Sequence, residues 1–278
     1  IVTSEGCLTE IHYGLLYNFY VGIDARKISS NDSWVVPTKA QYDSFIAYLG
    51  GTSVAGGKLK ETGLTYWLIP NTGATNLYGF NARGSGSRQP PSTPAFNYIN
   101  IYMQAWTIST ISTVAYTFGF IGYNNTIAQM DAAQKYYGYS LRLVNPTTTL
   151  THGQTGTYTG NDGKQYRTIC INNVEYLADN LAETKFRNGD YLHGYEGGSY
   201  QAISDANWSA LTSEGVCCYN DDINIYTDLS DLLRKYNIIV EQLILLNDKI
   251  GYYTEQEIMK FDHDIDKFWI IGEEGVVL

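Results

Sequence analysis

The chain has 278 residues, of which 18 are Lys or Arg and 28 are Asp or Glu, so its formal net charge is −10. This acidic balance argues against nucleic-acid binding, because phosphate backbones are bound by basic surfaces. The length allows a sizeable core, with one domain and an extension, and no apolar run approaches the ~20 residues that span a bilayer. The sequence begins at Ile1 without a signal peptide, so we expect a soluble, processed or truncated product.

The first clear element in chain order is a short helix from Thr38 to Leu49. Phe45, Ile46 and Leu49 fall on one side of it, and Thr38 is suited to be its N-cap. Other segments before residue 222 are short alternating or β-branched runs between Gly, Asn and Pro, such as 116–121 and 168–171. Such runs are typical of strands joined by turns. The sequence therefore predicts an α+β fold with a β-rich core.

The composition changes sharply after Tyr226. Apolar residues then recur in steps of three and four, behind an N-cap at Thr227 or Asp228, as in the a/d seam of a coiled coil. The seam consists of Leu229, Leu232, Tyr236, Ile239, Leu243, Leu246 and Ile250. We predict that 227–270 is a helical oligomerisation segment, with a trimer as the first choice. Two amphipathic helices that fold back on their own chain are the alternative.

Glycine-, aromatic- and turn-rich motifs follow one another in the first half of the chain, at 34–38, 48–51, 55–63, 70–76 and 79–82. This ordered string resembles the Fibrobacter succinogenes major paralogous domain family. The resemblance implies a C-type-lectin-like fold with a surface that displays and binds. It does not name a ligand.

The family's motifs come in an unusual order. Those that open the domain in the family lie late in this chain, at 162–168, 176–181, 187–190, 208–211 and 218–222, and Tyr176 stands where the family usually has Trp. We therefore predict a circularly permuted domain over 7–222. It would consist of a back half at 13–145, a joining loop at 146–157 and a front half at 158–222. Two incomplete repeats that exchange strands with neighbouring subunits are the alternative.

The stretch 83–142 is rich in Tyr, Asn, Ser and Thr, which combine large contact area with adaptable hydrogen bonding. The predicted ligand-binding residues are Arg88, Asn97, Tyr98, Asn100, Tyr102, Tyr123, Asn124 and Asn125. Tyr rings could stack on a sugar while Asn amides bind its hydroxyls, and a protein receptor would use the same groups. The resemblance also extends to the variable proteins of diversity-generating retroelements. An ordinary half-buried strand is the alternative, and Trp106 is expected in the core.

Catalysis and metal binding are not expected. Cys7, Cys170, Cys217 and Cys218 lack the spacing of a zinc or redox motif, so one long-range disulfide and buried free thiols both remain open. The histidines show no local signature of a nucleophile pair. The Asn and Asp residues of 220–222 offer oxygen ligands for calcium without the spacing of an EF-hand loop. The sequence thus predicts no enzyme, no metal and no cofactor.

Together these features predict a receptor-binding or adhesive display protein, as a phage tail or virion fibre component that recognises a bacterial surface glycan or protein. A trimer would raise avidity by about two to four orders of magnitude. The expected location is the virion, or alternatively the bacterial surface or the medium, with other virion or envelope proteins as partners. A structural virion or cell-envelope subunit and a bacterial surface adhesin are the alternatives.

Overall fold

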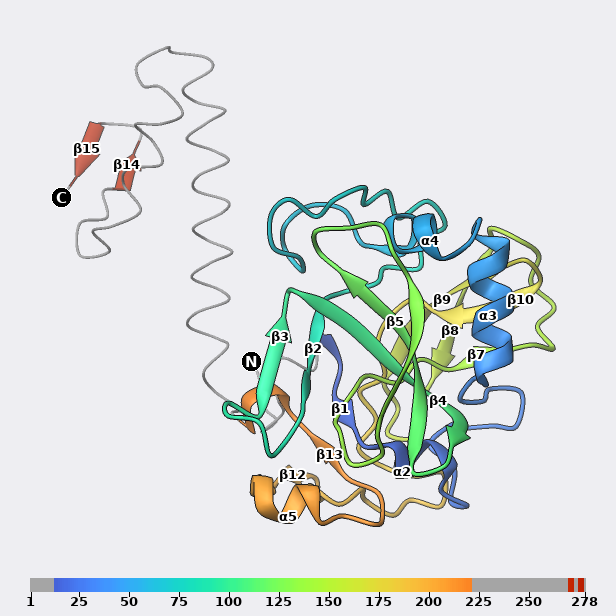
Figure 1. Ribbon diagram of the computed structural model, residues 1–278, viewed down its shortest axis with the longest axis vertical. Coiled ribbons are helices and arrows are strands. Elements are labelled where there is room, and N and C mark those ends of the chain that lie inside the picture. Colours follow the sequence, from blue (N-terminus) through green and yellow to red (C-terminus); the bar gives the residue numbers. More distant parts are fainter. Residues whose placement is uncertain (1–12, 222–269, 273–274, 278) are drawn as a thin grey trace. The chain divides into compact units, whose positions relative to one another are not determined.

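The computed structural model describes residues 13–221, 270–272 and 275–277. The chain divides into two compact units, Ile1–Ile225 and Tyr226–Leu278. In the second unit, β14 (Ile270–Gly272) pairs with β15 (Gly275–Val277) in antiparallel fashion (Figure 1).

The predicted heptad seam, from Leu229 to Ile250, lies outside the described residues, and so does Cys7. Ile270, the last residue of the predicted helical segment, lies in β14. The helical segment and the trimer therefore stay predictions.

Few residues of the first unit are helical. Its helices are α2 (Phe19–Ile23), α3 (Lys39–Tyr48), α4 (Thr52–Leu59), α5 (Asp205–Ser209) and the 3-10 turn η1 (Tyr219–Asp221). The predicted helix is confirmed as α3, and its start has a local cause. The Thr38 hydroxyl accepts from the Gln41 amide N–H at 3.3 Å, while the Gln41 side chain accepts from the Thr38 N–H at 2.8 Å. This capping box satisfies two donors that the first helical turn leaves open.

The first unit is rich in short strands. They are β1 (Leu16–Tyr17), β2 (Ser85–Arg88), β3 (Phe96–Ile99), β4 (Tyr102–Ile111), β5 (Val114–Gly122), β6 (Gln129–Gln134), β7 (Val144–Asn145), β8 (Thr155–Thr159), β9 (Gln165–Ile171), β10 (Val174–Leu177), β11 (Tyr195–Glu196), β12 (Ser199–Tyr200) and β13 (Val216–Cys217). The larger sheets have the orders β4-β5-β6 and β7-β10-β9-β8. The predicted strands at 116–121 and 168–171 lie within β5 and β9, so the expectation of a β-rich domain is confirmed.

Strands from the two halves of the first unit pair with each other within one chain. Leu16 of β1 lies opposite Cys217 of β13, and Val144 of β7 lies opposite Tyr176 of β10. These pairings join the predicted back and front halves within one chain. The circular permutation itself stays a prediction.

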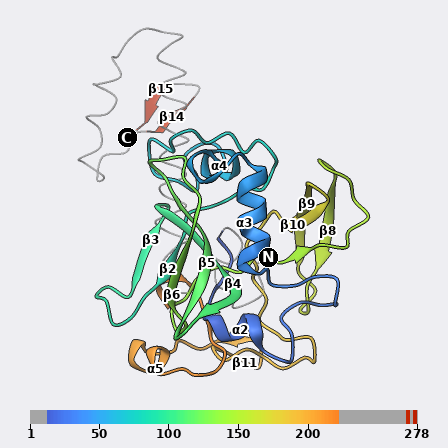
Figure 2. The ribbon, with the colours of Figure 1, turned by 45° about the vertical axis from the view of Figure 1, so that its right-hand side comes forward.

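Helix α3 joins the two larger sheets through its buried aromatic side chains, and Figure 2 shows it between them. The Tyr42 ring stacks on Phe118 of β5 at 3.8 Å, and the Phe45 ring stacks on Tyr176 of β10 at 4.3 Å. Such ring pairs contribute about 0.5–1.5 kcal/mol each beyond the burial of their area. Tyr176 is thus a core residue. Trp106 is fully buried, as expected.

Candidate ligand-binding face

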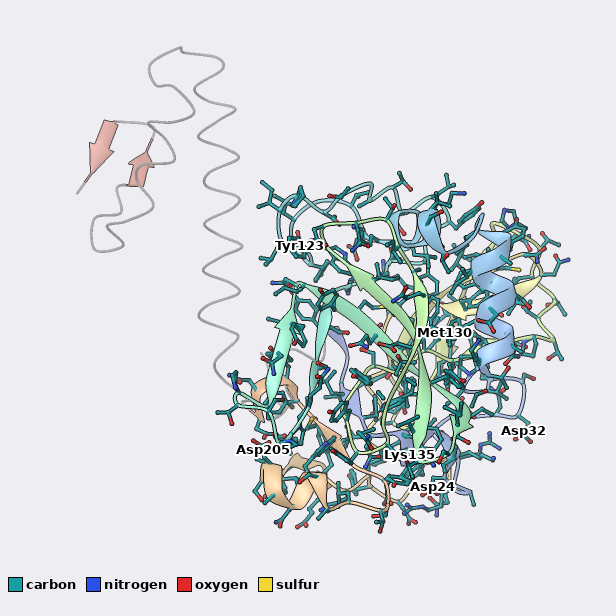
Figure 3. All side chains as sticks on the ribbon, in the orientation of Figure 1. Asp24, Asp32, Tyr123, Met130, Lys135 and Asp205 are labelled. Atoms are coloured by element: carbon teal, nitrogen blue, oxygen red, sulfur yellow. The ribbon has the colours of Figure 1, made fainter. Side chains whose placement is uncertain are left out.

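Six of the predicted ligand-binding residues lie at strand ends and in one connection of the first unit. We call them the polar-aromatic face: Tyr98, Asn100, Tyr102, Tyr123, Asn124 and Asn125. Tyr98 is the one exposed residue of β3, Tyr102 begins β4, and the last three follow β5. Figure 3 labels Tyr123 at the end of the unit opposite to Asp24, which follows α2.

Gly122 lets several of these side chains come together. Tyr102 lies opposite Gly122 in the β4–β5 ladder, and a methyl group at Gly122 would lie 3.1 Å from the Tyr102 ring and 2.9 Å from the Asn125 amide nitrogen. Asn125 also donates to the Asn124 amide oxygen at 3.2 Å. The Tyr98 ring meets the Tyr102 ring edge-on, with 5.3 Å between their centroids. The structure therefore joins Tyr98, Tyr102, Asn124 and Asn125 into one continuous surface.

Two residues near the end of β3 adopt the left-handed region, with φ of 69° at Tyr98 in the strand and 59° at Asn100 in the turn to β4. Asn tolerates this conformation, whereas it is uncommon for a bulky residue. The Asn100 N–H donates to the Gly84 carbonyl at 2.6 Å, and the Asn100 carbonyl accepts from the Leu68 N–H at 2.9 Å. The Asn100 amide oxygen accepts from the Tyr13 hydroxyl at 2.5 Å. Asn100 thus holds the turn, while the Tyr98 side chain is 43 % exposed.

A buried lysine supports the face from below. Lys60 is fully buried, and its ammonium donates to the carbonyls of Thr72, Gly122, Tyr123 and Asn125 at 2.9, 3.0, 3.3 and 2.8 Å. Burial lowers the pKa of Lys60 to about 8, while these carbonyls favour its charged form. Lys60 lies in the motif at 55–63, but nothing in the sequence indicated that it would reach the 122–125 connection.

We expect Lys60→Met to loosen the 122–125 connection and to lower the free energy of unfolding by roughly 2 kcal/mol. Buried carbonyls without a donor cost about 1–3 kcal/mol each. Part of that cost is offset because the variant no longer buries a charged ammonium group. The measurement is denaturant unfolding combined with amide hydrogen exchange of 122–128. Lys58→Met is the control, because Lys58 donates to a single carbonyl, that of Leu49. Equal protection of 122–128 in both variants would contradict the supporting role of Lys60.

Exposed apolar residues lie beside the face and were not predicted. Ile69 is 74 % exposed and Leu68 is 44 % exposed. Their loop is tied to the face, because the Leu68 N–H donates to the Asn100 carbonyl and the Thr72 N–H donates to the Tyr123 carbonyl at 2.7 Å. Exposed apolar surface next to a polar rim is typical of interaction sites. Only the unusual Leu and Ile pair before Pro70 could have pointed to it in the sequence.

Arg88 was wrongly predicted to bind ligand. Its side chain is fully buried, with one terminal nitrogen 2.8 Å from an Asp205 oxygen and 3.1 Å from an Asp221 oxygen. The guanidinium lies between the rings of Phe96 and Trp208, 4.8 and 4.5 Å from their centroids. These partners come from α5, η1 and β3, so Arg88 joins distant segments and does not reach a ligand.

Asn97 is also used within the structure. Its side-chain amide donates to the Pro94 carbonyl at 2.6 Å, and its backbone lies opposite Ser87 in the β2–β3 ladder. The half-buried Asn97 therefore stabilises the turn of its own hairpin. It is not part of the polar-aromatic face.

The cysteines and the metal-binding side-chain types were also located in the described residues. Cys170, Cys217 and Cys218 are buried. Within 13–221 and the C-terminal hairpin, no three His, Cys, Asp or Glu side chains gather as a metal site. None of the helices in that same part of the chain is long and apolar enough to cross a membrane.

The fold and the face together define a β-rich α+β domain that presents a continuous tyrosine and amide surface on a rigid support. Residues 8–145 match the family model of the Fibrobacter succinogenes major domain. Through this segment the chain belongs to the Fibrobacter succinogenes major domain family, as the resemblance predicted. The match includes every residue of the polar-aromatic face. Searches among curated proteins and among solved structures gave no significant match.

Proposed function

We propose that this protein is a receptor-binding or adhesive display protein whose polar-aromatic face recognises a bacterial surface glycan or protein. The observation that carries the proposal is the gathering of Tyr98, Tyr102, Asn124 and Asn125 around Gly122, next to the exposed Leu68 and Ile69. Tyrosine supplies contact area at a low entropy cost, and amides adapt their hydrogen bonds to the partner. None of the six face residues carries a charge, so the ligand surface is uncharged or only weakly charged.

The proposal includes a particular setting for the domain. We assign it a C-type-lectin-like fold with its halves in permuted order, similar to the variable proteins of diversity-generating retroelements. A phage tail or virion fibre fits such a display domain, and a bacterial surface adhesin is the alternative. In both settings the domain binds a partner and has no catalytic role.

A structural subunit of a virion or cell envelope is the second candidate. The exposure of Leu68 and Ile69 favours it, because a neighbouring protein would bury these apolar side chains. Substitutions in the polar-aromatic face would affect a different property under each of the two candidate functions. A receptor site would lose binding with assembly intact, whereas a structural contact would lose assembly.

The first test measures binding of the purified protein to bacterial envelope polysaccharides and to intact cells. We expect selective binding that falls at least about tenfold in a Tyr98→Ala/Tyr123→Ala double variant, because each lost ring removes stacking worth about 0.5–1.5 kcal/mol. Tyr20→Ala is the control, since Tyr20 lies in α2, away from the face. Equal binding by the double variant and the control would refute the face as the receptor site.

Oligomerisation through the predicted heptad seam is a separate part of the proposal. Changing Leu232, Ile239 and Leu246 to Asp should dissociate a coiled-coil oligomer, because each substitution places a charge in an apolar seam. Light scattering would show the fall in mass, and circular dichroism would show that the β-rich domain is still folded. An unchanged mass would exclude this seam as the oligomer interface.

A further inference from the structure

A hollow lies beside α3, away from the polar-aromatic face. It has a volume of about 280 Å³ and lies between α3 and the turn that joins β9 to β10. This is close to the lower end of the roughly 300–1,000 Å³ of small-molecule pockets. Its floor is apolar and aromatic, formed by Phe45, Val144, Val174 and Tyr176. Figure 1 shows α3 and β3 on opposite sides of the strands β4 and β5.

Tyr48, which lines this hollow, belongs to a cluster of three aromatic rings. The Tyr48, Tyr78 and His152 ring centroids are 5.7 to 6.2 Å apart in all three pairs, and the rings are inclined at 47° to 69°. We call them the aromatic rim. Tyr48 lines the hollow itself and is 41 % exposed, and His152 is exposed as well. The rings come from three separate segments, and the half-buried Tyr78 also packs against the core, so the cluster has a firm support.

Polar groups are placed next to the rings. Asn172 lines the hollow and is exposed, and its backbone N–H donates to His152 Nδ1 at 3.2 Å. Asn172 and Asn173 form a two-residue turn between β9 and β10 with φ of 52° and 61°, which fixes the backbone at Asn172 beside the hollow. Ser44 and Gln41 line the opposite side, on α3.

The hollow is uncharged. Among the described residues that line it, none is acidic or basic. The nearest charges on α3, Lys39 and Asp43, are paired with each other at 2.6 Å. A charged ligand would therefore lose hydration without gaining an ion pair, which is unfavourable.

We propose that this hollow is a binding site for one neutral sugar residue, formed by Tyr48 and Asn172 over the aromatic floor, with Tyr78 and His152 next to them. A pyranose has an apolar face for the rings and a rim of hydroxyls for the amides of Asn172 and Gln41, and this matches the arrangement of the hollow. The site is independent of the polar-aromatic face and of the ligand that the face takes. It would add a second contact to a glycan chain or act alone.

The experiment uses the full chain and saturation-transfer NMR with methyl glycosides. The panel contains neutral glucosides, galactosides and N-acetylglucosaminides, together with a glucuronide and a sialoside as charged probes. We expect at least one neutral glycoside to bind, with an affinity that falls about tenfold in Tyr48→Ala and is unchanged in Tyr20→Ala, in α2. The charged probes should bind more weakly.

Asn172→Asp gives a second variant that keeps the left-handed turn, since Asp tolerates it. It should weaken binding of the neutral glycoside and leave the thermal unfolding midpoint unchanged within a few degrees. The proposal is overturned if no neutral glycoside binds, if Tyr98→Ala removes the binding while Tyr48→Ala does not, or if a charged probe binds more tightly. Loss of cell binding only in the Tyr98 variants would concern the proposed receptor face and not this site.

Discussion

Arg88→Met is expected to lower the free energy of unfolding by roughly 3–5 kcal/mol, because removing one member of a buried ion pair leaves its partner without compensation. Asp221 loses its cation in this variant, while Asp205 is about half exposed and is solvated by water. The variant also loses the contacts of the guanidinium with the rings of Phe96 and Trp208. Urea unfolding of the wild-type protein and the variant measures the difference.

A double variant separates the ion pair from simple loss of packing. Adding Asp221→Asn to Arg88→Met removes the unpaired carboxylate, so part of the lost stability should return. The folded fraction of Arg88→Met should keep its binding through the polar-aromatic face. If Arg88→Met instead kept its stability and lost ligand binding, Arg88 would be a ligand-binding residue after all.

The second large effect concerns pH and depends on Glu183. This side chain is fully buried, and its carboxylate accepts from the Tyr166 hydroxyl at 2.7 Å and from the Asp162 N–H at 3.1 Å. Burial, together with the nearby Asp162 carboxylate, raises the pKa of Glu183 from 4.5 to about 7, and the ion pair of Asp162 with Lys164 opposes this only in part.

A carboxyl whose pKa is higher in the folded protein binds more protons there than in the unfolded chain. Its contribution to stability is therefore fully present below pH 4.5 and is lost as the pH rises through about 7. The shift corresponds to about 3 kcal/mol at 1.36 kcal/mol per unit.

The measurement is denaturant unfolding from pH 4.5 to 8 for the wild-type protein and Glu183→Gln. The stability of the wild-type protein relative to the variant should fall by about 3 kcal/mol over this range. Asp43→Asn is the control, since this carboxylate lies on the surface of α3. Parallel stability curves for the wild-type protein and Glu183→Gln would show that Glu183 is already ionised at pH 5.

Local features of this protein followed from the sequence. The helix α3, its N-cap at Thr38, the strands β5 and β9 and the burial of Trp106 were all predicted. Each depends on interactions within a few residues or on the apolar character of a single side chain, and such causes are visible in a short window. The family assignment also followed, because its motifs lie in order along residues 8–145.

The roles of individual polar residues were decided only by the tertiary structure. Arg88 is charged and lies in a Tyr- and Asn-rich stretch, so the sequence suggested a surface residue. Its carboxylate partners lie 117 and 133 residues further along the chain, and the folded protein buries the side chain next to them. Lys60 similarly finds carbonyls more than 60 residues away.

The surfaces were decided in the same way. The polar-aromatic face needs Gly122 opposite Tyr102, and the aromatic rim joins Tyr48, Tyr78 and His152 from three segments. Composition predicted that Tyr and Asn side chains would be available for binding. Which of them share a surface depends on strand register and long-range packing, which no local pattern encodes.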